Sequence, residues 1–128
     1  MSTPTGHKRA WHAAGEFNDA TEVDLKLAHD ADSIIYLTKV TFSITTHANG
    51  KKLYVQDSDE MDTNTQSVYA AHTDATAGAG VPSVVTYDFG KWGIPLPAGL
   101  DLVFVSETGG PDGWVYAEGW EDIGDGTE

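Results

Sequence analysis

Short runs of alternating apolar and polar residues recur along this chain, and such alternation is typical of β-strands that bury one face. The longest run, residues 34–46, is rich in β-branched residues, which favour a strand over a helix. The period of two predicts one apolar face made of Ile34, Tyr36, Val40, Phe42 and Ile44. Further strands are predicted at residues 22–27, 52–56, 66–73, 84–89, 100–105 and 114–120.

Turn signals separate these runs. Asn49-Gly50 is a favoured tight-turn pair and predicts a hairpin between residues 34–46 and 52–56. Two prolines stiffen the turn at residues 90–99, so we expect Trp92 to be held there as a plug at one end of the domain. About seven or eight short antiparallel strands with frequent turns predict an all-β fold, a jelly-roll β-sandwich.

By composition the chain divides into three parts. Residues 1–21 lack periodicity and predict an extended N-terminal arm, residues 22–123 form the jelly-roll domain, and residues 124–128 form an acidic C-terminal tail. The arm contains Trp11 and Phe17, two large aromatics that a purely solvated segment seldom keeps. Two interpretations stay open, in which these rings contact neighbouring subunits or pack onto their own domain.

The charge of the chain is unevenly distributed. The formal net charge is −13, yet residues 1–15 carry Lys8 and Arg9 with no acid, while residues 16–128 carry five Lys and 20 acids. The acidic balance argues against nucleic acid as a partner, because neutralising phosphates requires clusters of Lys and Arg. We expect the basic, aromatic arm to lie along other subunits while the acidic domain faces solvent.

Cysteine and histidine usage limits the chemistry. There is no cysteine, so neither a disulfide framework nor thiol catalysis is available. The histidines are scattered without the spacing of a zinc site: His7, His12, His29, His47 and His72. The sequence also shows neither a signal-peptide pattern nor an apolar run of about 20 residues, so neither a secreted nor a membrane-spanning chain is expected.

An acidic segment at residues 57–64 is the best candidate for a metal site. Its carboxylates, Asp57, Asp59 and Asp62, are the hard oxygen ligands that Ca²⁺ prefers. The segment lacks the glycine and the distal glutamate of an EF-hand loop. The favoured interpretation is a solvated acidic loop that keeps an edge soluble, so no cofactor and no metal is predicted.

No catalytic motif is present. The sequence contains no nucleophile elbow, phosphate loop or dinucleotide fingerprint. Carboxylate pairs for glycoside hydrolysis arise by chance among 20 acids. The members of such pairs would be Glu107, Asp112, Glu118 and Glu121. We therefore expect a protein that is not an enzyme.

Aromatic residues near the C-terminus allow two interpretations. Exposed aromatic faces beside acids are how sugar-binding surfaces are built, but the same rings serve as core or intersubunit packing. The strands at 100–105 and 114–120 carry apolar residues on both faces, which favours a subunit contact on one of them. The predicted oligomer interface comprises Trp92, Leu102, Phe104, Trp114, Tyr116 and Trp120.

The order of these parts resembles small phage virion proteins. The matching segments are Gly90-Lys91-Trp92, then residues 97–102, then Val115-Tyr116-Ala117-Glu118 leading to Glu121, with residues 33–46 and 51–55 upstream. The resemblance covers residues 22–123. It implies a jelly-roll fold, a homotrimer and a place on the outside of a capsid, as a decoration or cement protein made in the host cytoplasm.

This resemblance assigns partners to the predicted parts. The major capsid protein is the expected partner, with neither nucleic acid nor membrane involved. The predicted capsid-binding arm carries Lys8, Arg9, Trp11 and Phe17. The alternative is a carbohydrate-binding or host-adhesion module of a phage tail or of an extracellular assembly.

Overall fold

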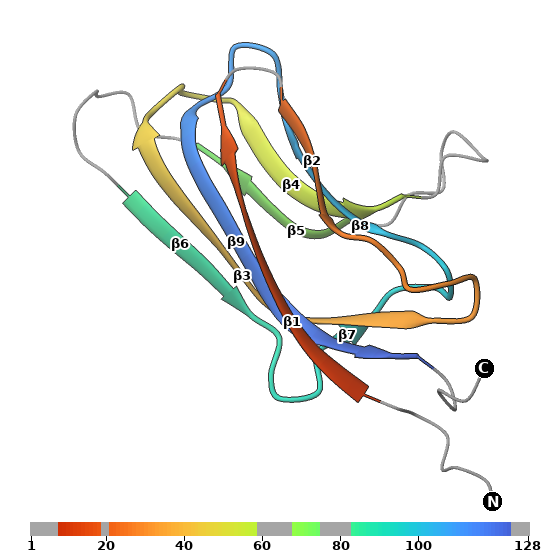
Figure 1. Ribbon diagram of the computed structural model, residues 1–128. Coiled ribbons are helices and arrows are strands. Elements are labelled where there is room, and N and C mark those ends of the chain that lie inside the picture. Colours follow the sequence, from red (N-terminus) through yellow and green to blue (C-terminus); the bar gives the residue numbers. More distant parts are fainter. Residues whose placement is uncertain (1–7, 19–20, 59–67, 75–82, 124–128) are drawn as a thin grey trace, which may run out of the picture.

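The structure, a computed structural model, describes residues 8–18, 21–58, 68–74 and 83–123, which form strands joined by turns (Figure 1). The strands are β1 (Lys8–Phe17), β2 (Thr21–Lys26), β3 (Ile34–Thr46), β4 (Lys52–Asp57), β5 (Val68–Thr73), β6 (Ser83–Asp88), β7 (Ile94–Pro95), β8 (Leu102–Ser106) and β9 (Asp112–Asp122). The described ranges hold no helix with the length and apolar character of a membrane span. The all-β prediction is confirmed.

The strands form two antiparallel sheets that face each other (Figure 1). One sheet has the order β1-β9-β3-β6, with the two-residue β7 also paired to β3, and the other has the order β2-β8-β4-β5. The chain crosses between the sheets after β1, β2, β3, β5, β7 and β8, and the first strand lies beside the last. This strand order is that of a jelly roll.

The core fills the space between the two sheets. The ring centroid of Phe104 on β8 lies 5.0 Å from that of Phe17 on β1 and 5.9 Å from that of Phe42 on β3. All three side chains are buried. Because these rings come from both sheets, their packing holds the sandwich together, and aromatic pairs contribute about 0.5–1.5 kcal/mol beyond the area they bury.

The strand β3 has the predicted bounds, but its first half faces the other way. Ile35 and Leu37 are buried, whereas Ile34 and Tyr36 are not. The pairing with β9 shifts between Leu37 and Lys39, a bulge that reverses which side chains point inward. Opposite this bulge stands Gly119, where a side chain would collide with the backbone oxygen of Tyr36.

The predicted hairpin between residues 34–46 and 52–56 is wrong. The turn exists, with Gly50 at φ 83°, but β3 pairs with β6, β7 and β9, whereas β4 pairs with β5 and β8. The turn therefore carries the chain from one sheet to the other. A local turn signal cannot show which strand its neighbour pairs with, because pairing depends on distant segments.

Residues 8–17, expected to belong to an extended arm, form the edge strand β1. All ten pair with β9, from Lys8 opposite Asp122 to Phe17 opposite Gly113. Phe17 is 1% exposed and Trp11 packs against the core. This part of the predicted arm packs onto its own domain, because Phe17 is a member of the core cluster between the sheets and Trp11 packs against that cluster. Residues 1–7 and the predicted tail at 124–128 lie outside the described residues.

Candidate functional site

A solvent-exposed tryptophan marks the turn between β6 and β7. Gly90 and Gly93 adopt φ values of 88° and 76°, which glycine tolerates best. The Trp92 side chain between them is 67% exposed, so the predicted plug is wrong for this residue. Within the predicted turn at residues 90–99, the buried apolar residue is instead Leu96, which follows β7 and is 1% exposed. The indole of Trp92 is left available to a partner.

Contacts to Trp92 link this turn to the beginning of β1. The indole Nε1 of Trp120 donates a hydrogen bond to the backbone oxygen of Trp92 at 3.1 Å. The Trp120 ring stacks on Tyr36 at 3.8 Å between centroids. The ammonium groups of Lys8 and Lys91 lie 5.2 Å from the ring centroids of Trp120 and Trp92. We call Lys8, Lys91, Trp92 and Trp120 the tryptophan end.

A buried carboxylate lies under the neighbouring part of β1. Glu121 on β9 is 1% exposed, and its Oε2 accepts a hydrogen bond from the backbone N–H of His29 at 2.8 Å. Lys26 Nζ lies 2.8 Å from Oε1, an ion pair whose angles fall outside those of a hydrogen bond. Arg9, predicted for the capsid-binding arm, reaches the same oxygen at 4.0 Å. Glu121 thus links two segments to β9, namely the start of β1 and the start of the connection between β2 and β3.

The predicted oligomer interface does not form one surface. Leu102 and Phe104 are 0% exposed within the protomer, so they are core residues that no neighbouring subunit can reach. Trp114 and Tyr116 remain 41% and 45% exposed on the outward face of β9. The inward apolar residues of β8 thus reflect burial in the core.

The acidic segment falls largely outside the described residues. Asp59 and Asp62 belong to that part. Asp57 is 1% exposed and accepts a hydrogen bond from the hydroxyl of Tyr69 at 2.9 Å, so this carboxylate stabilises the pairing of β4 with β5. Among the described residues, no group of three or more potential ligands could hold a metal ion.

The carboxylates considered for catalysis are separated by the fold. Glu118 points outward from β9 and Glu121 points inward, so they lie on opposite faces of one strand. Glu107 accepts a hydrogen bond from the backbone N–H of Lys52 at 2.9 Å.

Sequence reasoning missed a buried histidine cluster. His47 Nδ1 lies 2.9 Å from Asp74 Oδ1, and Ser83 Oγ lies 3.3 Å from His47 Nε2. The order of groups is that of a serine nucleophile with its base. However, the side chains of His47 and Asp74 are 2% and 1% exposed, and Asp74 also accepts the backbone N–H of Ala48. We interpret the cluster as a set of contacts that holds the two sheets together.

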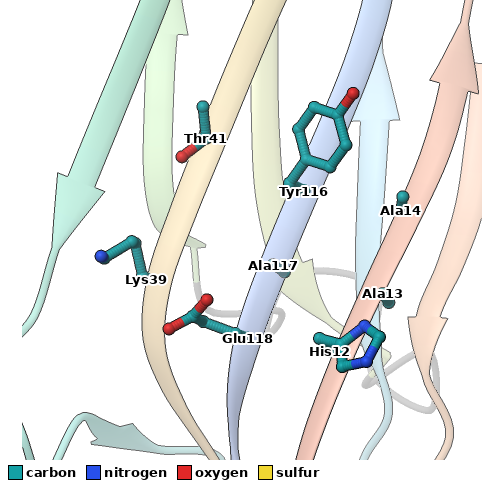
Figure 2. A pocket seen from close by; sticks show the side chains of 8 residues that line it. All are labelled: His12, Ala13, Ala14, Lys39, Thr41, Tyr116, Ala117 and Glu118. Atoms are coloured by element: carbon teal, nitrogen blue, oxygen red, sulfur yellow. The ribbon is translucent and has the colours of Figure 1, made fainter.

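A second exposed feature is the outward face of the five-stranded sheet. A shallow hollow of about 420 Å³ lies on this face. Its lining residues, shown in Figure 2, are His12, Ala13, Ala14, Lys39, Thr41, Tyr116, Ala117 and Glu118. The residues come from β1, β9 and β3, which are neighbours in the sheet. Tyr116 and Trp114 belong to this face, whereas Trp92 and Trp120 were assigned to the tryptophan end.

No protein-family model matches this chain, and no curated protein matches it. Among solved structures it is similar to a protein of the disulfide-linked pili of Bacillus endospore appendages, with 10% identity, 95% of this chain and 93% of that chain covered, and a TM-score of 0.46. A chain of infectious bursal disease virus, Gt strain, has 13% identity over 99% of this chain and 35% of that chain, at a TM-score of 0.47. Eiger TNF from S. frugiperda has 12% identity over 91% and 98%, also at 0.47. Scores and identities this low assign neither a family nor a function.

Proposed function

We propose that this protein is a non-enzymatic structural protein of a virion, namely a phage capsid decoration (cement) protein that binds and stabilises the major capsid shell as a homotrimer. The observation that carries the proposal is the tryptophan end, where Trp92 is 67% exposed beside two lysines. Tryptophan dominates the energetics of many protein interfaces, and its exposure brings no stability to an isolated domain. We assign this end to the contact with the shell.

Charge and resemblance support the same role. With a net charge of −13, the proteins repel one another and nucleic acid, so clustering away from the shell is disfavoured. The turn that carries Trp92 belongs to the segments that resemble phage decoration proteins. The lysines of the tryptophan end supply cations next to apolar rings, a combination suited to a partner surface with carboxylates.

The test is to bind the purified protein to shells assembled from the major capsid protein of the same phage. Trp92→Ala is compared with Val84→Ala, because both side chains are 67% exposed in the wild type. We expect Trp92→Ala to lower retention on sedimented shells at least tenfold and Val84→Ala to leave it unchanged. Both variants should keep their stability within about 0.5 kcal/mol, as surface substitutions usually do.

Location and stoichiometry decide the rest of the proposal. Cryo-EM of virions should place the chain on the shell as trimers, and light scattering should give a trimer in solution. A position at the tail tip, or shells that bind neither wild type nor variant, would overturn the assignment. A stable monomer at micromolar concentration would show that the free protein is not a trimer.

Deleting residues 2–7 leaves β1 intact and tests the part of the predicted arm that precedes it. A deletion that extends to residue 15 would remove most of β1 as well.

A further inference from the structure

The outward face of the five-stranded sheet presents side chains in rows across four strands. The register aligns Ala14, Tyr116, Thr41 and Thr86 in one row. The next row holds His12, Glu118, Lys39 and Asp88. Apart from Tyr116, the side chains of the first row are short. The second row carries both positively and negatively charged side chains.

The aromatic rings of β9 stand clear of their neighbours. Tyr116 lies between Ala14 and Thr41, whose side chains are too short to cover its ring (Figure 2). Trp114 lies two residues away on the same face, about 7 Å along the strand. Both rings are more than two-fifths exposed, at 45% and 41%. Together they offer two neighbouring flat apolar surfaces.

The hollow beside Tyr116 continues across the sheet. A second hollow of about 340 Å³ shares Lys39 and Glu118 with the first and ends at Asp88, Gly90 and Lys91. The two hollows adjoin at Lys39 and Glu118 and together extend from β1 to the β6–β7 turn. We call the pair of hollows the sheet groove. It runs across the strands, next to the exposed rings.

The polar groups at the centre of the sheet groove have no side-chain partner among the described residues. Lys39 and Glu118 are opposite each other in the β3–β9 ladder. Even so, within the residues that the structure describes, neither side chain makes an ion pair or a hydrogen bond of its own. A hydrogen-bond donor and an acceptor therefore flank an open space.

The charges of the groove differ from those of the whole chain. Lys39 and Lys91 balance Glu118 and Asp88, although the protein as a whole carries −13. A balanced groove selects neither a cationic nor an anionic ligand. The unpaired charges at its centre also argue against a protein partner, because the centres of protein interfaces are depleted of charged residues and unpaired burial is costly.

We propose that the sheet groove binds a neutral oligosaccharide. Pyranose rings stack on Tyr116 and Trp114 through their C–H faces, and their hydroxyl groups donate to Glu118 and Asp88 and accept from Lys39 and His12. Hydroxyl groups need donors and acceptors side by side, as the groove offers them. The sheet groove shares Lys91 with the tryptophan end but neither of its tryptophan rings, and the proposal does not depend on the attachment to a shell.

The test is an array of neutral oligosaccharides probed with the labelled wild-type protein, followed by calorimetric titration of the best ligand. We expect Tyr116→Ala and Glu118→Gln each to weaken binding at least tenfold. Trp92→Ala is the matched control and should bind the sugar as the wild type does while it loses the shell, so failure of this proposal is distinct from failure of the proposed function.

Three results would overturn the oligosaccharide assignment. The first is an array on which no neutral oligosaccharide binds the wild type at millimolar concentration. The second is binding that survives Tyr116→Ala unchanged. The third is a change of oligomeric state in Tyr116→Ala, which would show that the face contacts a second copy of this chain.

Discussion

The strands β8 and β9 both carry apolar residues on their two faces, but their outward faces differ in exposure to solvent. On β8, Val103 is 4% exposed, although it lies outside the main core cluster. On β9, Tyr116 on the outward face is 45% exposed. Both are interior strands of their sheets, so a position at the sheet edge does not explain the difference.

The cross-strand neighbours explain the contrast. Val103 lies between Asp24 and Gln56, side chains at least as long as valine itself. Tyr116 lies between Ala14 and Thr41, both much shorter than tyrosine. Burial on the outward face of a sheet therefore depends on the relative length of adjacent side chains. The exposure of the aromatic rings on β9 therefore depends on the side chains of the neighbouring strands as well as on β9 itself.

The largest expected effect comes from truncating one buried and one exposed aromatic side chain. Phe104→Ala removes a ring that is 0% exposed and should lower the free energy of unfolding by about 3–5 kcal/mol. Tyr116→Ala removes an exposed ring and should cost less than about 1 kcal/mol. Urea denaturation of both variants measures the difference. Equal losses would show that Tyr116 is covered in solution.

A second prediction concerns the buried end of β9. Glu121→Gln keeps the shape of the side chain but removes the charge that faces Lys26 at 2.8 Å. A hydrogen bond to a charged group is worth about 1.5–3 kcal/mol. The substitution makes the acceptor of the His29 N–H neutral and removes the charge opposite Lys26, so a loss of about 2 kcal/mol is expected. Glu118→Gln on the outward face is the control and should change the unfolding free energy by less than about 0.5 kcal/mol.

A third prediction changes the neighbour instead of the ring. Ala14→Leu places a longer side chain beside Tyr116 and should shield the ring. We expect unfolding to stay within about 0.5 kcal/mol of the wild type, because position 14 is exposed, while oligosaccharide binding falls several-fold. Calorimetric titration checks the binding. Unchanged affinity would mean that the short neighbours of Tyr116 are irrelevant to the groove.

The smallest effect is expected at the exposed turn before β3. The pKa of Asp30 is lowered because its carboxylate accepts hydrogen bonds from the backbone N–H of Asp32 and from the hydroxyl of Ser33. A lowered pKa stabilises the fold above about pH 4, and this contribution is lost as the pH falls through the folded-state pKa. Asp30→Asn should therefore lower the thermal midpoint slightly at pH 6 and by less at pH 2.5. An equal shift at both values would exclude a role for the charge.

The sequence alone determined most of the strands and the class of fold. The bounds of β3 follow from a run of β-branched residues, and the alternation of β9 correctly separates the inward Val115 and Ala117 from the outward Trp114 and Tyr116. These features depend on the period of two, which is local. The strand count and turn spacing then favoured a jelly roll, and the pairing confirms it.

Only the tertiary structure decided which surfaces are free. The bulge in β3 reverses the inward face at Leu37, the Asn49-Gly50 turn connects two sheets, and residues 8–17 complete a sheet by pairing with the last strand. Each outcome depends on a partner strand far away in the sequence. Likewise the exposure of Trp92 and the groove beside Tyr116 arise from the side chains that other strands place around them, and no local pattern contains that information.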